Sequence, residues 1–317
     1  MTKCGKIYRR YCALFLFYFL NFNCYSTPMR ILFTIAHFYN PSGDGKHASQ
    51  RNDPQPRLNA LTSCVTSLQA LYGKSQSMID IRECATIPAN QSQQHEIDIV
   101  ICTTQGYHLL HQLPVQPRCF MHHATKCEPL LLGFECQAVL RACLNKYDYF
   151  CYLEDDLVLH DPWFFSKLKW FTHHAGNGNL LQPNRYEIAP QGAVFKAYVD
   201  GDLAESATSQ FQNVEEQRQL MGKIMEQTIA LQRALNPHSG CYFLNAEQMA
   251  HWAKQSHFLD RDTSFIGPLE SAATLGIMRT FRVYKSTPAY ANFLEIQHFG
   301  AGFLKLIGNK VRMRQEG

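Results

Sequence analysis

One segment of this sequence joins a buried strand to a cluster of negative charge. Residues 147–153 are mostly aromatic and apolar, and Glu154, Asp155 and Asp156 follow directly. The apolar run has the composition of a buried β-strand. Three adjacent carboxylates need solvent or a cation, because removing each charge from water costs several kcal/mol. The segment therefore favours a strand that carries a carboxylate cluster to a sheet edge, where a hard divalent metal takes oxygen ligands; a solvated acidic turn is the alternative.

The formal charge is concentrated at the start of the chain. The 317 residues are 46% hydrophobic, which is enough for one large domain or two small ones. The charge of +4 comes from 30 basic and 26 acidic residues, and residues 1–28 contain four of the basic ones and no acid. The remainder is formally neutral, so it has no broad electrostatic surface for nucleic acid. We expect no nucleic-acid partner.

Residues 1–28 look detached from the fold. Four basic residues precede an apolar run at 11–20, which is about half the length that spans a bilayer. The run resembles a signal-peptide core, but no clean small-residue cleavage site follows it. There are two other interpretations: residues 1–28 are upstream translation before a natural start at Met29, or they are a weak anchor that gives peripheral membrane contact. We divide the chain into this extension, a domain at 29–305 and a basic tail at 306–317.

The cysteines indicate a reducing compartment. Nine of the 12 follow Met29, no pair forms a Cys-x-x-Cys motif, and most lie in apolar runs. This pattern favours buried thiols in the cytoplasm, with membrane association through residues 1–28 left open. No residues have the spacing of a zinc site.

Strand-like and helix-like segments alternate over the first half of the domain. Expected strands are 30–36, 78–81, 97–103, 118–125 and 147–153, and expected helices are 57–72 and 130–145. This alternation predicts an α/β fold, with a mostly parallel sheet flanked by helices in a single domain. Later expectations are a hairpin around 190–192, a helix at 213–235 with an apolar stripe, a strand at 240–244, a helix from Pro268 and a strand at 279–285.

Two strand ends carry candidate binding groups. Ligands of open α/β sheets bind beyond the carboxyl ends of the strands. His37 follows the first strand, and the acid triplet follows another. If these strands are neighbours, a nucleotide could lie across both, with Mg²⁺ or Mn²⁺ bridging its diphosphate to the acids. Arg57 and His37 are candidates for contacting the base or phosphate.

The order of these motifs resembles the GT-A fold of nucleotide-sugar glycosyltransferases, which is Rossmann-like. Glu154-Asp155-Asp156 stands where that family has its D-x-D metal motif, although the first residue is Glu. The segments 57–61, 238–244, 267–271 and 294–300 are similar to its first helix, its acceptor-side segment, an acidic helix start and a late metal-binding His. The resemblance covers about residues 29–300 in element order.

This resemblance implies a metal-dependent enzyme that moves a sugar from a nucleotide-diphosphate donor to a hydroxyl of a carbohydrate, lipid or protein acceptor. Asp156 would bind Mn²⁺ or Mg²⁺ directly, and His298 would be a further metal ligand or a contact to the diphosphate. Asp155 or Glu154 would contact ribose or a metal-bound water. Glu270 would be the general base in an inverting displacement.

Three other interpretations are compatible with the same residues. A metal-dependent hydrolase or nucleotidyltransferase would use the same acids. A non-catalytic nucleotide- or carbohydrate-binding protein could retain the fold alone. A two-domain GT-B transferase could also begin with such a strand, but the pattern after residue 170 lacks a second Rossmann-like half.

Overall fold

A five-stranded sheet forms the centre of the molecule. The computed structural model describes residues 28–42 and 48–313, so the expectations for residues 1–27 lie outside it. The strand order is β13-β6-β1-β4-β5, and all neighbours are parallel except β13 against β6. Its strands are β1 (Arg30–Ala36), β4 (Glu96–Thr104), β5 (Met121–Thr125), β6 (Tyr149–Glu154) and β13 (Cys241–Asn245).

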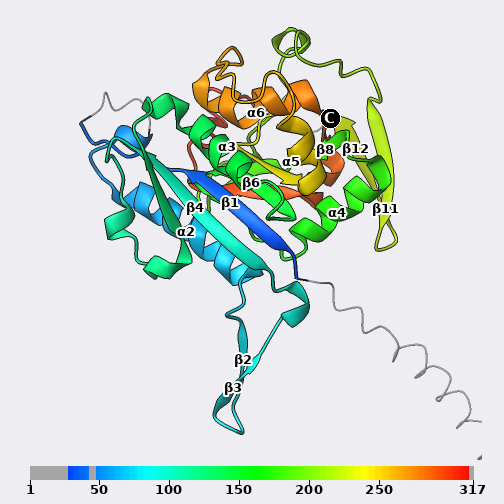
Figure 1. The fold of residues 1–317 in the computed structure, drawn as a ribbon. Coiled ribbons are helices and arrows are strands. Elements are labelled where there is room, and N and C mark those ends of the chain that lie inside the picture. Colours follow the sequence, from blue (N-terminus) through cyan, green and yellow to red (C-terminus); the bar gives the residue numbers. More distant parts are fainter. Residues whose placement is uncertain (1–27, 43–47, 314–317) are drawn as a thin grey trace, which may run out of the picture.

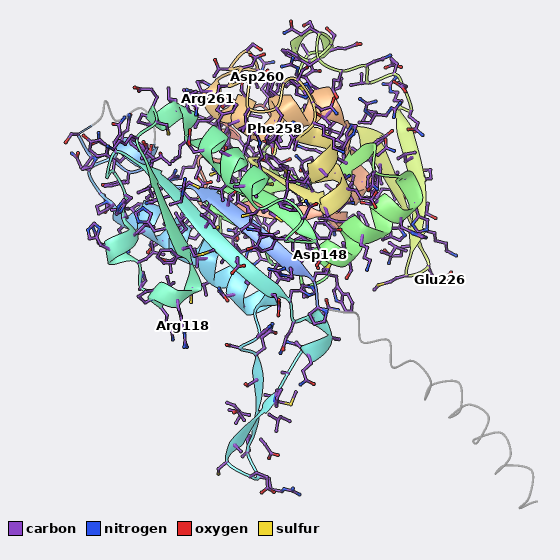
Figure 2. The ribbon with its side chains drawn as sticks, in the orientation of Figure 1. Arg118, Asp148, Glu226, Phe258, Asp260 and Arg261 are labelled. Atoms are coloured by element: carbon purple, nitrogen blue, oxygen red, sulfur yellow. The ribbon has the colours of Figure 1, made fainter. Side chains whose placement is uncertain are left out.

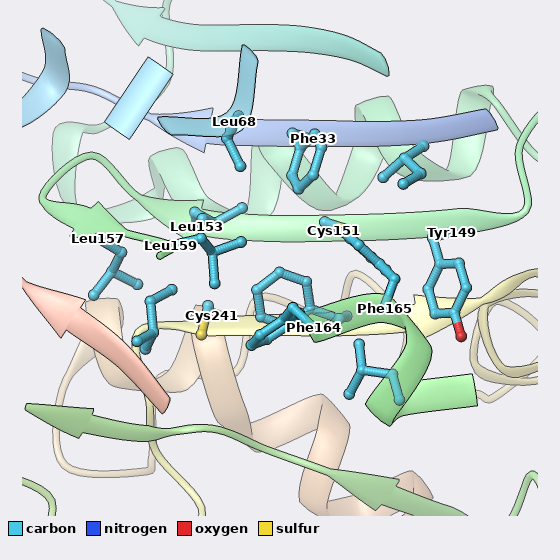
Figure 3. Packing of buried hydrophobic residues seen from close by; sticks show 14 of the residues in the cluster. Phe33, Leu68, Tyr149, Cys151, Leu153, Leu157, Leu159, Phe164, Phe165 and Cys241 are labelled. Atoms are coloured by element: carbon cyan, nitrogen blue, oxygen red, sulfur yellow. The ribbon is translucent and has the colours of Figure 1, made fainter. Parts of the chain in front are cut away.

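Helices cover both faces of this sheet (Figure 1). On one face, alternate side chains of β1 such as Phe33 pack with α2 (Gln55–Tyr72) and α4 (Phe164–Ala175). Figure 3 shows part of this core, in which the ring centroid of Phe165 lies 6.0 Å from that of Phe33 and 5.8 Å from that of Phe164. The other face packs against α3 (Leu132–Ala142), α5 (Ala246–Trp252) and α6 (Pro268–Thr280). The arrangement is a mixed α/β fold, as the alternating pattern predicted.

The register of the sheet decides where the candidate site lies. β1 and β6 are direct neighbours, and Ala36 pairs with Glu154 at their carboxyl ends. The two strands whose ends carry His37 and the acid triplet are therefore adjacent, as a shared site requires. The acid triplet lies at the end of a central strand, which is where open α/β sheets bind ligands.

Two smaller sheets connect the second half of the chain to the first. One has the order β10-β9-β15-β7, and the other β11-β12-β14-β8. The first contains β7 (Leu157–Val158), β9 (Asn184–Ile188), β10 (Lys196–Tyr198) and β15 (Glu295–His298); the second contains β8 (Asn179–Leu181), β11 (Gln219–Ile224), β12 (Gln227–Arg233) and β14 (Arg282–Ser286). β7 follows the triplet immediately, and His298 pairs with Leu157. This pairing brings the late histidine beside the acids. The expected hairpin around 190–192 is confirmed as β9 and β10.

The helix expected at 213–235 is wrong. This segment contains the antiparallel hairpin of β11 and β12, and Figure 2 shows Glu226 at its tip. Its side chains alternate between more and less exposed positions, as in a strand. Met225 and Glu226 both have a positive φ, which the tight turn requires. The spacing of the apolar residues fits a helix by coincidence, whereas the segment adopts the two-residue period of a strand.

The strand expected at 78–81 forms, but outside the central sheet. β2 (Ser77–Asp80) pairs only with β3 (Ala85–Pro88) within the described residues. Figure 1 shows this hairpin projecting away from the body of the molecule. Several of its apolar side chains are exposed: Met78, Ile79, Ile81 and Ile87. An apolar run alone cannot distinguish a sheet strand from such a projection.

The nine cysteines after Met29 are free thiols, and five of them are buried. Among residues 28–42 and 48–313, no helix has both the length and the apolar character needed to cross a bilayer.

Candidate functional site

A pocket of about 970 Å³ opens at the carboxyl ends of β1 and β6. Six of the seven site residues expected from the sequence line it, although they are spread over more than 240 positions: Arg57, Glu154, Asp155, Asp156, Glu270 and His298. Ligand sites are commonly pockets of this size in which a few polar groups converge. The fold thus gathers the candidate residues into one place.

Arginines supply much of the positive charge that the acid triplet requires. Arg57 lies on the first turn of α2 and contacts two of the acids, with Nη2 2.7 Å from Asp155 Oδ1 and Nη1 3.0 Å from Asp156 Oδ2. Arg185 Nη1, from β9, lies 3.3 Å from Glu154 Oε2. A metal ion is therefore not required to explain why three carboxylates share this edge.

His37 contacts Asp155 but does not line the pocket. The side chain is fully buried, and its Nδ1 lies 2.5 Å from Asp155 Oδ2. Its Nε2 accepts a hydrogen bond from the backbone N–H of Leu109 at 3.1 Å. Because both ring nitrogens are bonded within the protein and His37 does not line the pocket, the expected direct contact with a nucleotide is replaced by a role in holding Asp155.

His298 belongs to a chain of three side chains that ends at Asp156. Its Nε2 lies 3.6 Å from Asp156 Oδ2, and its Nδ1 lies 2.8 Å from Glu187 Oε1. Burial alone would lower the pKa of His298, but the hydrogen bond to Glu187 and the charge of Asp156 raise it overall. Burial would raise the pKa of Asp156, but Arg57 and His298 hold it below its usual value. Both shifts favour the charged forms of the two side chains in the absence of a ligand.

Glu154 differs electrostatically from its two neighbours. Burial raises its pKa to about 7, and the charge of Arg185 opposes that rise. Arg185 also pairs with Asp200, with its Nη2 2.8 Å from Asp200 Oδ1.

Gly240 lies against Glu154 with a φ of 63°, and a Cβ at that position would overlap Glu154 Oε2. A glycine is needed here for both space and backbone conformation.

A buried layer of polar side chains fixes Arg185; it consists of Asp200, His238, Thr274 and Lys285. Lys285 Nζ donates to the carbonyl of His238 at 2.6 Å and lies 3.8 Å from Asp200. His238 Nδ1 is 3.0 Å from Thr274 Oγ1. Burial, followed by the charge of Arg185, lowers the pKa of His238 to about 3, so this histidine is neutral. From the sequence alone, His238 is notable only as part of segment 238–244, and Asp200, Lys285 and Glu187 are not singled out, because single polar residues carry no local motif.

Glu270 reaches the pocket from the third position of α6. Within residues 28–42 and 48–313, its carboxylate forms no ion pair and no hydrogen bond with another side chain. Its charge contributes to the raised pKa of Glu154, so the two carboxylates share one electrostatic environment. Glu270 is thus a carboxylate available to a ligand.

The residues fit a metal ion in part. Within the described ranges, no three His, Cys, Asp or Glu side chains form an arrangement that could hold one. Asp156 Oδ1 is nevertheless buried without a hydrogen-bond partner among those same residues, and His298 presents Nε2 with its other nitrogen held by a carboxylate. Such carboxylate–histidine pairs are typical of metal-binding histidines, and Mg²⁺ often takes only one or two carboxylates together with substrate phosphates.

No protein-family model matches this sequence, and no curated protein matches it either. The fold is similar to the crystal structure of mouse xyloside xylosyltransferase 1 in its apo form, with a TM-score of 0.38 and 13% sequence identity. The match covers 81% of this chain and 85% of the other. A likeness this distant supports no conclusion about activity, so the function must be argued from the side chains of the pocket.

Proposed function

We propose that this protein is a metal-dependent glycosyltransferase that moves a sugar from a nucleotide-diphosphate donor to an acceptor hydroxyl. One observation carries the proposal: a single pocket joins the acid triplet with its arginines to the carboxylate of Glu270. The first group suits a diphosphate, and the second suits a hydroxyl that must lose its proton.

The donor would bind on the side of the triplet. Arg57 faces the pocket with two of its nitrogens on Asp155 and Asp156, while its buried Nε has no hydrogen-bond partner in the part of the chain that the structure describes. A guanidinium in this position can bind phosphate oxygens. Asp156 and His298 would hold the Mn²⁺ or Mg²⁺, which when bound supplies Lewis-acid stabilisation of the departing diphosphate.

Glu270 would act on the acceptor. Its carboxylate would accept the hydroxyl proton while the hydroxyl oxygen forms a bond to the anomeric carbon of the donor sugar. The bond from that carbon to the diphosphate oxygen breaks, and its electron pair leaves with the nucleoside diphosphate. Direct displacement of this kind inverts the anomeric carbon, so the product stereochemistry also tests the role of Glu270.

Thermal unfolding with Mn²⁺ and UDP tests the donor site. We expect the two ligands together to raise the Tm, and Asp156→Asn to remove most of that rise, because stabilisation follows ligand concentration over Kd. Asp80→Asn, on the exposed β2–β3 hairpin, is the matched control and should keep the full rise. A full metal-dependent rise in Asp156→Asn would refute the site.

Nucleotide release from UDP-sugars separates a transferase from its rivals. A transferase releases UDP faster with an acceptor, and Glu270→Gln should lower kcat by about 10²–10⁴-fold, the usual contribution of a general base. Release that is equally fast without any acceptor would indicate a hydrolase. Binding without release of UDP from any sugar donor would indicate a non-catalytic protein.

A further inference from the structure

The pocket has an apolar side as well as a charged one. We call Leu130, Leu131, Pro268 and Leu269 the apolar wall, and all four line the pocket. Leu130 is 49% exposed and Leu269 is 38% exposed. Exposed leucines are common singly, but here two of them lie on one wall of a pocket that also contains Glu270. Such a grouping is typical of a ligand-binding surface.

The wall is built from two segments that pack together. Leu130 and Leu131 belong to a short 3₁₀ helix at Pro129–Leu131, and Pro268 and Leu269 form the first turn of α6. The two segments are in contact, and α3 also packs on α6 just behind them. The buried side chain of Gln137 donates to the carbonyl of Ala272 at 2.8 Å and fixes these helices together. The wall is therefore preformed.

Glu270 connects the wall to the charged side. Leu269 and Glu270 both line the pocket from the first turn of α6, and the charge of Glu270 acts on Glu154, which lines the same pocket. A group resting on the wall would place an attached hydroxyl close to the Glu270 carboxylate. The leucine and proline side chains of the wall offer no hydrogen bonds, so they favour an apolar group over the hydroxyls of a further sugar.

Resting on the function proposed above, we infer that the acceptor carries an apolar group, aliphatic or aromatic, next to its nucleophilic hydroxyl, and that the apolar wall binds this group. Burying such a group removes apolar surface of both ligand and wall from water. The wall thereby selects the acceptor class, while the charged side selects the donor.

Calorimetric titration with three glucosides tests this inference on the full chain. Octyl, phenyl and methyl β-D-glucoside present the same sugar with different apolar groups, and octyl glucoside is used below its micelle concentration. We expect octyl or phenyl glucoside to bind at least tenfold more tightly than methyl glucoside. The better of the two identifies an aliphatic or an aromatic preference. Equal affinities for all three, or no binding of any, would overturn the inference.

Variants of the wall locate the preference. Leu130→Gln combined with Leu269→Gln should reduce the affinity for the preferred glucoside at least tenfold and leave that for methyl glucoside unchanged. Ile79→Gln removes an exposed apolar residue from the distant β2–β3 hairpin and should behave as the wild type. Retained preference in the double variant, or its loss in Ile79→Gln, would place the apolar group elsewhere and refute the inference.

Sedimentation velocity distinguishes an acceptor subsite from a dimer interface. The wild type and the double variant should have the same mass. A wild-type dimer that becomes a monomer in the double variant would make the wall an interface between copies and contradict the inference.

Glucoside binding also separates the subsite from the transferase activity, because binding needs no turnover. If UDP release is absent but the octyl or phenyl preference is retained, the transferase is rejected and the apolar subsite is kept.

Discussion

At the level of single residues, Gly240 is a constrained position beside the site. It has a φ of 63°, its carbonyl accepts from the N–H of Glu154, and an added Cβ would overlap the Glu154 carboxylate. We expect Gly240→Ala to lower the free energy of unfolding by about 1–3 kcal/mol, because left-handed backbone and overpacking both cost energy. Urea denaturation measures this change. Gly201→Ala, where a Cβ meets no atom of the described residues within 4 Å, should change stability little; equal losses in the two variants would contradict the explanation.

The buried His238 should contribute a loss of stability in mild acid. Its pKa is lowered to about 3 in the fold, chiefly by burial, whereas the unfolded chain has the ordinary value near 6.5. Between these values the unfolded state binds a proton at His238 that the folded state does not, so the contribution of His238 to stability is lost as the pH falls below about 6.5.

The variant His238→Asn isolates that contribution from the other titrating groups. Between pH 6.5 and 5.5 the wild type should lose about 1 kcal/mol more of its free energy of unfolding than this variant, because an unfolded histidine with a pKa near 6.5 goes from half to about nine-tenths protonated over that interval. Urea unfolding at several pH values provides the comparison. Parallel pH profiles for the two proteins would show that His238 does not titrate on unfolding.

At the level of elements, the β11–β12 hairpin shows how local period can mislead. Leu220, Ile224 and Leu231 can be read as one helical stripe, but they lie on two strands joined at Met225 and Glu226. Gly222, in the middle of β11, lies where a Cβ would overlap the ring of Trp170. Packing of the strand against α4 thus fixes a conformation that helical propensity alone does not favour.

The turn of this hairpin can be improved. Met225 and Glu226 have φ values of 46° and 64°, a backbone conformation that costs energy for residues other than glycine. Replacing them with Asn-Gly should raise the free energy of unfolding by about 0.5–1 kcal/mol, because this pair suits a turn with two positive φ angles. Urea denaturation measures the gain. A loss of stability would mean that the exposed Lys223–Glu226 ion pair matters more than the backbone.

At the level of the whole molecule, the spacing of α3 and α6 positions the apolar wall relative to the sheet. A Cβ on Gly133 would lie 2.6 Å from the Cβ of Ala272 and 3.1 Å from the hydroxyl of Tyr152. These residues belong to α3, α6 and β6, so the contact joins three elements around the pocket. The small side chains allow the layers to approach closely.

A double-mutant cycle tests this packing. Gly133→Ala should lower the free energy of unfolding by about 1–3 kcal/mol through overpacking. Ala272→Gly in the same chain should recover part of that loss, because it removes the nearest obstructing methyl group. Urea denaturation of the three variants yields the coupling energy. Simple additivity of the two losses would show that the helices do not meet at these residues.

The sequence predicted the central sheet well, because each strand carries its own signal. The apolar runs at 30–36, 97–103 and 147–153 all form neighbouring parallel strands. The position of the acid triplet followed from the same local pattern, since a charge cluster after a buried strand must lie at the edge of the sheet. Local composition was sufficient for these features.

Only the tertiary structure decided what the acids contact. Arg57 reaches Asp156 across 99 positions of sequence, and Arg185 reaches Glu154 across 31. The same holds for the ion pair of His298 with Glu187 and for the hydrogen bond of Lys285 to His238, because each joins residues that are far apart in the sequence. Ion pairs form between groups that are close in space, and no local pattern records which strands will be neighbours. For that reason the sequence determined where the charge lies, and the fold determined how it is neutralised and which groups face the pocket.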